Sequence, residues 1–109
     1  MGLYPLRIYY LQAQKQVELP GDESVLKAGF AVSKRYFKKA VDRNRIKRLI
    51  REGYRLQKLP LQEAVEKNSV ILHLFFIYTG KELPDFNLIK EKTGALLHKL
   101  HAELIKPPL

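Results

Sequence analysis

The side chains with the clearest chemical potential lie together in residues 34–58, which we call the basic segment. This segment holds 11 of the 20 Lys and Arg residues of the 109-residue chain, and only two of its 11 acids. Its excess positive charge therefore equals the net charge of the whole chain, +9. A local block of one sign is the electrostatic footprint of a polyanion site, and Arg adds paired hydrogen bonds to phosphate. The side chains that we expect to contact nucleic acid are Lys34, Arg35, Lys38, Lys39, Arg43, Asn44, Arg45, Lys47, Arg48, Arg51 and Arg55.

Groups that could catalyse a reaction by themselves are dispersed along the chain. There is no cysteine, so the chain has no thiolate zinc site and no cysteine nucleophile. A two-metal nuclease needs clustered carboxylates, whereas the acids here lie apart, within residues 18–23, 63–66 and 82–85. His98 and His101 are spaced to share a helix face, but they lack a cysteine or a pattern of nearby acids. We therefore predict no catalytic and no metal-binding side chain.

Two other interpretations of the basic segment are a solvated charged face and a helix lying on a membrane surface. The polar face of the helix is of one sign, is contiguous with Lys34, Arg35, Lys38 and Lys39, and is balanced nowhere nearby, which argues against an ordinary charged face. A membrane-surface helix has no sheet to bury its apolar side, whereas this one is predicted to pack on a fold. No apolar run reaches the ~18–20 residues of a membrane span and no signal peptide is recognised, so we expect a soluble cytoplasmic protein without a membrane partner.

Three strands are predicted in one domain over residues 1–109. Residues 6–11 and 25–33 are rich in β-forming side chains, and we expect them to pair as an antiparallel hairpin. Residues 69–78 are nearly all apolar, which predicts a central strand buried on both faces. His73 in this strand is expected to be a buried core histidine.

Helices are predicted to cover this sheet. A helix over residues 42–56 would begin at Asp42 as N-cap and bury Ile46, Leu49, Ile50 and Gly53. Pro60 would open a short helix, and Asp85 would cap a long last one. The apolar stripe of that last helix is Phe86, Ile89, Thr93, Leu96, Leu97, Leu100 and Leu104.

The order β-β-α-(α)-β-α predicts an α+β fold, a two-layer α/β sandwich. If the second and third predicted strands are parallel neighbours, the basic helix is the crossover between them.

Two runs of residues resemble the signature of the bacterial ribonuclease P protein component. The family pattern is an apolar-Ser-Lys-Lys/Arg strand end, a short basic connector and a helix that opens Arg-Asn-x-x-Lys-Arg-x-x-Arg. Residues 30–35 match the strand end, and residues 39–52 match the helix. The positions matched in the helix motif are Arg43, Asn44, Lys47, Arg48 and Arg51. The order of flanking elements fits from about residue 6 to about residue 104, although residues 1–5 leave no room for the aromatic helix with which family members usually begin.

The resemblance implies a ribosomal protein S5 domain 2-like fold, a small mixed sheet with a left-handed β-α-β crossover. It also implies the protein subunit of a ribonucleoprotein endonuclease that removes the 5′ leader of precursor tRNA. Catalysis would reside in the RNA subunit with its Mg²⁺ ions, so that the protein alone is inactive. The implied partners are ribonuclease P RNA and precursor tRNA, with no obligate protein partner.

Within this family the matched helix residues would contact the catalytic RNA. A cleft for the single-stranded leader would be lined by Tyr9, Tyr10, Phe30, Val32 and Ser33. Leaders vary in sequence, so stacking and phosphate contacts are the recognition expected there. An ordinary core position for Phe30 stays open as an alternative. A basic RNA-binding protein of ribosomal type would share the charge block but lack the ordered motif.

Overall fold

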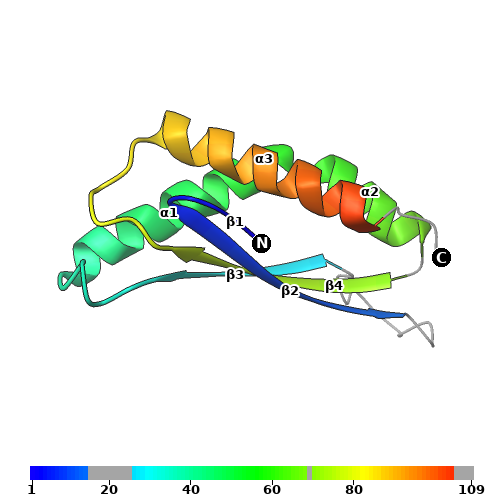
Figure 1. Cartoon of the computed structure of the whole chain (residues 1–109), viewed down its shortest axis with the longest axis horizontal. Coiled ribbons are helices and arrows are strands. Elements are labelled where there is room, and N and C mark those ends of the chain that lie inside the picture. Colours follow the sequence, from blue (N-terminus) through cyan, green and yellow to red (C-terminus); the bar gives the residue numbers. More distant parts are fainter. Residues whose placement is uncertain (15–25, 69, 105–109) are drawn as a thin grey trace.

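The computed structural model describes residues 1–14, 26–68 and 70–104, with the side chains of Gln14 and Leu104 excepted. Its strands are β1 (Gly2–Leu3), β2 (Leu6–Gln14), β3 (Leu26–Val32) and β4 (Val70–Tyr78). Its helices are α1 (Ala40–Gln57), α2 (Leu59–Lys67) and α3 (Phe86–Leu104). The described chain therefore has the predicted α+β composition, with a four-stranded mixed sheet and three helices (Figure 1).

The strand order in the sheet is β1-β2-β4-β3. β4 pairs antiparallel with β2 and parallel with β3, so the hairpin predicted between the first two long strands is wrong. β4 is the most apolar strand, and in this position its main-chain groups pair on both sides, with β2 and with β3. The parallel pairing confirms that the basic helix α1, together with α2, forms the crossover from β3 to β4.

All three helices cover one face of the sheet, and no described helix or strand covers the opposite face, which we call the open face (Figure 1). Along β4 the burial alternates, with Leu72, Leu74 and Phe76 facing the helices and His73 and Phe75 exposed. The prediction that this strand is buried on both faces, with His73 in the core, is therefore wrong. Both faces of β4 carry mostly apolar residues, so the alternation of burial leaves no alternation of polarity in the sequence.

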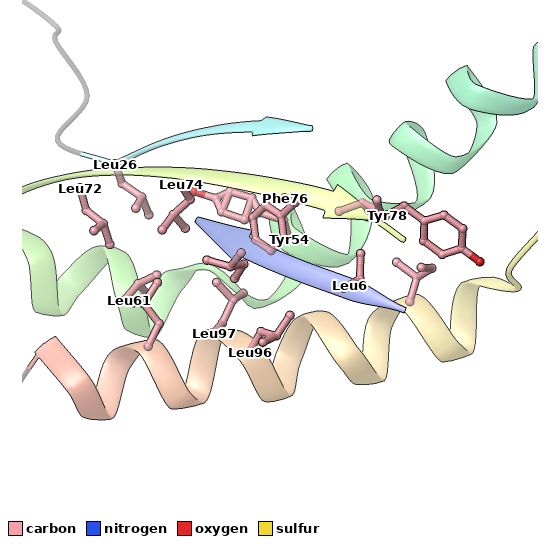
Figure 2. Close-up of a cluster of buried hydrophobic side chains, with 14 of the residues drawn as sticks. Leu6, Leu26, Tyr54, Leu61, Leu72, Leu74, Phe76, Tyr78, Leu96 and Leu97 are labelled. Atoms are coloured by element: carbon pink, nitrogen blue, oxygen red, sulfur yellow. The ribbon is translucent and has the colours of Figure 1, made fainter. Parts of the chain in front are cut away.

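The core fills the space between the sheet and the helices. In Figure 2, Leu61 of α2 and Leu96 and Leu97 of α3 point toward the sheet, where β4 carries Leu72 and Leu74. Phe76 at the centre of the core is completely buried. This packing holds α1 and α3 against the sheet and fixes the direction in which their outer faces point.

The helix ends follow the prediction at α3 and differ from it at α1. Oδ1 of Asp85 accepts a hydrogen bond of 2.8 Å from the Leu88 amide, as expected of an N-cap. α1 begins at Ala40 instead, and Asp42 lies in its first turn, where a carboxylate stabilises the positive end of the helix dipole. In the predicted stripe of α3, Phe86 is half-buried, and the side chain of Leu104 lies outside the described residues.

Candidate nucleic-acid interface

α1 presents a row of basic and amide side chains to solvent. Ile46 and Ile50 are completely buried and anchor the helix on the sheet. On the other side are Asn44, Arg48, Arg51 and Arg55, which we call the basic face. Their spacing of i, i+4, i+7 and i+11 keeps all four on one side of the helix, and all are exposed. Arg45 is also exposed, whereas Lys47 is half-buried at the flank.

Arg43, the first arginine of the motif, is turned back on the chain. Its Nη1 atom donates hydrogen bonds of 2.8 Å to the carbonyl oxygens of Phe37 and Lys38. These two residues belong to residues 33–39, the connector between β3 and α1. Arg43 therefore holds the connector in place against the start of α1. Its contact with nucleic acid stays a prediction.

Arg55 differs from the rest of the basic face because it has an acidic partner. Its Nε donates a 3.1 Å hydrogen bond to Oε2 of Glu52, and the two side chains form an ion pair. The hydrogen bond from Arg55 lowers the pKa of Glu52, and the same bond raises the pKa of Arg55. Among the described residues, Arg48 and Lys47 have no acidic partner, so their charges are more available than that of Arg55 for binding an anion.

Arg51 rests on an aromatic cluster that rises from the core. Its guanidinium carbon lies 5.5 Å from the ring centroid of Phe30, a cation–π contact. Phe30 stacks on Phe76 at 5.6 Å and meets Tyr54 edge-on at 6.0 Å. Burial raises the pKa of Tyr54 to about 12, so its phenol stays neutral at ordinary pH. Phe30 therefore links Arg51 of the basic face to the buried rings of Tyr54 and Phe76.

The open face of the sheet carries exposed aromatic and apolar side chains. Tyr9 of β2 and Phe75 of β4 are direct cross-strand partners and are 54% and 45% exposed. Leu11 and His73 form the next outward-facing pair, and both are exposed. A Cβ on Gly29 would come within 2.8 Å of the Phe75 ring, so the absence of a side chain there lets the ring lie against β3.

The five residues predicted to line one cleft lie on two sides of the sheet. Tyr9 is on the open face, whereas Phe30 and Val32 pair with buried residues of β4 and face the helices. Tyr10 also falls on the helix-facing side by its register, although it is exposed, and Ser33 is half-buried. Because side chains alternate along a strand, Phe30 and Val32 cannot share a cleft with Tyr9. The fold therefore does not bring the five residues together, and their contact with the leader stays a prediction.

The exposed apolar residues of β4 were missed by sequence reasoning. The run that contains Phe75 and His73 has no polar alternation to mark its outer side. One signal could have found them: a single layer of helices leaves one face of a sheet uncovered.

In the described ranges 1–14, 26–68 and 70–104, no three His, Asp or Glu side chains gather where they could hold a metal ion. In that same part of the chain no helix has both the length and the apolarity needed to cross a membrane.

Comparison with known proteins matches this architecture to one family. The family model described as Ribonuclease P matches residues 2–101. A ribonuclease P protein component from Porphyromonas gingivalis is 37% identical over 89 residues, covering 81% of this chain and 61% of the relative. One from Chlorobium phaeobacteroides is 31% identical over 102 residues, covering 87% of this chain and 68% of the relative.

A third protein of that name, from Chlorobaculum tepidum, is 58% identical over 56 residues, or 48% of this chain and 36% of the relative. The chain spans about three fifths of the length of the Porphyromonas gingivalis relatives. No solved structure matches it. Because the family model takes in the sheet, the connector and the basic helix together, this chain belongs to the ribonuclease P protein component family.

Proposed function

We propose that this chain is the protein subunit of ribonuclease P and assists the removal of the 5′ leader from precursor tRNA. It binds the catalytic RNA through the basic face of α1 and the connector, and the single-stranded leader through the open face of the sheet. The observation that carries the proposal is the division of the molecule into two surfaces. One is a single-signed cationic helix face, and the other is a sheet face with exposed aromatic rings.

The basic face suits a folded RNA. The major groove of double-stranded RNA is too narrow for side chains to read, so proteins contact its phosphates and 2′-hydroxyl groups. Arg48 and Arg51 present planar guanidinium groups for paired hydrogen bonds to phosphate. Asn44, one turn before Arg48, offers both a donor and an acceptor.

The open face suits a strand of variable sequence. Tyr9 and Phe75 expose rings on which unpaired bases can stack whatever their identity. Arg7 and Lys27 project from the same face and supply charge for the leader phosphates. We therefore place the leader along this face, with Tyr9 retained from the sequence prediction, and with Phe75 in place of Phe30 and Val32.

The chemistry itself belongs to the RNA in this proposal. The described residues bring no carboxylate or histidine cluster together, so they do not fit a Mg²⁺ site. We propose that the ions are held by the RNA subunit and the substrate, and that the chain contributes binding and orientation. The assignment also implies the left-handed crossover and the ribosomal-protein-like fold expected from the family.

Reconstitution tests this proposal directly. The chain is added to a bacterial ribonuclease P RNA at low Mg²⁺, with 5′-labelled precursor tRNA as substrate. We expect cleavage at the mature 5′ end only when RNA and protein are both present, because in this proposal the RNA supplies the chemistry and the chain supplies binding and orientation. Cleavage by the purified protein with Mg²⁺ would show that it is an independent nuclease. Failure to stimulate the RNA would favour a basic protein of ribosomal type.

Replacing Arg48 tests the assignment of the basic face. Arg48→Ala is expected to weaken binding to the catalytic RNA by about 10- to 150-fold, the usual range for a lost hydrogen bond to a charged group. Lys99→Ala is the matched control, because Lys99 is an exposed cation on α3, outside the basic face. Binding is measured by titrating the protein into labelled RNA at constant salt. Equal losses in the two variants would refute the site.

A further inference from the structure

An exposed tyrosine in the connector contacts two cations, its neighbour Arg35 and the distant Lys81. The Tyr36 ring is 40% exposed. The guanidinium carbon of Arg35 lies 5.6 Å from its centroid, and Nζ of Lys81 lies 5.5 Å from the same point. Lys81 is outside the basic segment and follows β4. Neither the open face of the sheet nor the basic face of α1 includes these three residues.

The topology of the sheet explains why Tyr36 and Lys81 meet. β3 and β4 are parallel, and their last residues, Val32 and Tyr78, are register partners. The chain therefore leaves both strands at the same end of the sheet. Figure 1 shows the connector to α1 and the segment leading to α3 emerging together at that end, beside the start of α1.

Both segments are held in place by a buried aromatic pair. Phe37, next to Tyr36, is buried and packs on Tyr78 with centroids 5.9 Å apart. The Tyr78 hydroxyl donates a 2.5 Å hydrogen bond to the carbonyl of Glu82. On the other side, Arg43 holds the carbonyls of Phe37 and Lys38. The residues beside Tyr36 and Lys81 are thus fixed, so the ring and its cations are arranged before any ligand binds.

The charges around the ring call for an anionic ligand. Arg35 and Lys81 are both exposed, and neither forms an ion pair within the described residues. Two cations held on one ring repel each other, and a bound phosphate removes that repulsion. Proteins bind single-stranded nucleic acid by stacking bases on aromatic rings and by contacting the phosphates with nearby cations, and both kinds of group are present here.

We infer that Tyr36, Arg35 and Lys81 form a platform that stacks one unpaired base of RNA and contacts its phosphates. This inference rests on the proposed function as an RNA-binding subunit, and it assigns to the connector, together with Lys81, the binding of one unpaired nucleotide at the end of the sheet. The recognised chemistry is a single-stranded nucleotide rather than a base-paired helix, because a paired base has no free face for the ring.

The test uses the full chain and two labelled probes, a single-stranded oligouridylate of about 12 nucleotides and an RNA duplex of about 12 base pairs. Tyr36→Ala is expected to weaken binding of the single strand by about 5- to 150-fold and to leave duplex binding unchanged. Tyr36→Phe keeps the ring and should bind as the wild type does. Lys81→Gln should reduce the salt dependence of single-strand binding by about 0.7 in log–log slope, while Lys99→Gln should not.

Photocrosslinking gives a second measurement that needs no variant. An oligouridylate that carries 5-iodouridine is irradiated with the wild-type chain, and the adduct is mapped by mass spectrometry. We expect an adduct on Tyr36. If the wild type binds both probes but Tyr36→Ala binds the single strand equally well, the platform is wrong and the proposed function stands. Equal losses on both probes would also overturn the platform. A wild-type chain that binds neither probe would instead overturn the proposed function.

Discussion

The affinity of the chain for ribonuclease P RNA is expected to fall by about 10³- to 10⁵-fold as salt rises from about 50 to about 200 mM. The reason is the concentration of positive charge in the connector and α1, where exposed cations face solvent with Glu52 as the one ion-pair partner among the described residues. If about 6–10 phosphates are neutralised, each releases bound counterions, and the loss of affinity is correspondingly steep.

The measurement is a series of binding titrations over this salt range, plotted as the logarithm of the affinity against the logarithm of the salt concentration. Each phosphate contact contributes about 0.9 to the slope for double-stranded nucleic acid. Arg48→Ala should lower the slope by about one unit, whereas Lys99→Ala should leave it unchanged. A flat salt response of the wild type would contradict the polyanion site as a whole.

Two neighbouring phenylalanines are expected to give opposite results when each is replaced by alanine. Phe76→Ala should lower the free energy of unfolding by about 3–5 kcal/mol, because Phe76 is completely buried and packs on Phe30 and Tyr54. A loss of this size is a large part of the total stability of an ordinary domain, which is about 5–15 kcal/mol. The midpoint of urea unfolding, followed by circular dichroism, measures it.

Phe75→Ala is the matched counterpart, with the same change one residue earlier. Phe75 is on the open face, so its replacement should alter the urea midpoint little and should weaken binding of a single-stranded leader RNA by about 5- to 150-fold. If Phe75→Ala is destabilised as much as Phe76→Ala, the Phe75 side chain is buried in the folded protein and does not lie on an exposed face. If it is stable but binds the leader as the wild type does, the leader does not lie on this ring.

Local patterns predicted the elements well. The spacing of Ile46 and Ile50 identified both the basic helix and the side on which it is buried, because helical periodicity is a property of consecutive residues. The N-cap at Asp85 could also be predicted locally, because it depends only on the residue type just before the helix. Asp42 was chosen by the same rule and lies instead within the first turn, since the helix begins two residues earlier, without a side-chain cap at Lys39.

The pairing of strands and the contacts between distant segments could not be predicted in this way. Alternation along a strand tells which residues share a face but not which strand lies beside it, so the insertion of β4 between β2 and β3 left no local trace. The same limit applies to the site. The type and position of Arg43 suggested nucleic-acid binding, while its contacts with Phe37 and Lys38 depend on how the connector folds. Lys81 meets Tyr36 only through the parallel register of the sheet.

The register between β3 and β4 also limits how this chain can change in length during evolution. Inserting or deleting one residue early in β4 would turn Phe75 into the core and Phe76 out to solvent, because every side chain beyond the change would switch faces. Such a change would bring His73 to the core side and turn Leu72 and Leu74 to the open face, so it would disturb the core and the face proposed for the leader at the same time. Substitutions can adjust the core side and the open face of the sheet separately, but a change in the length of β4 alters both faces at once.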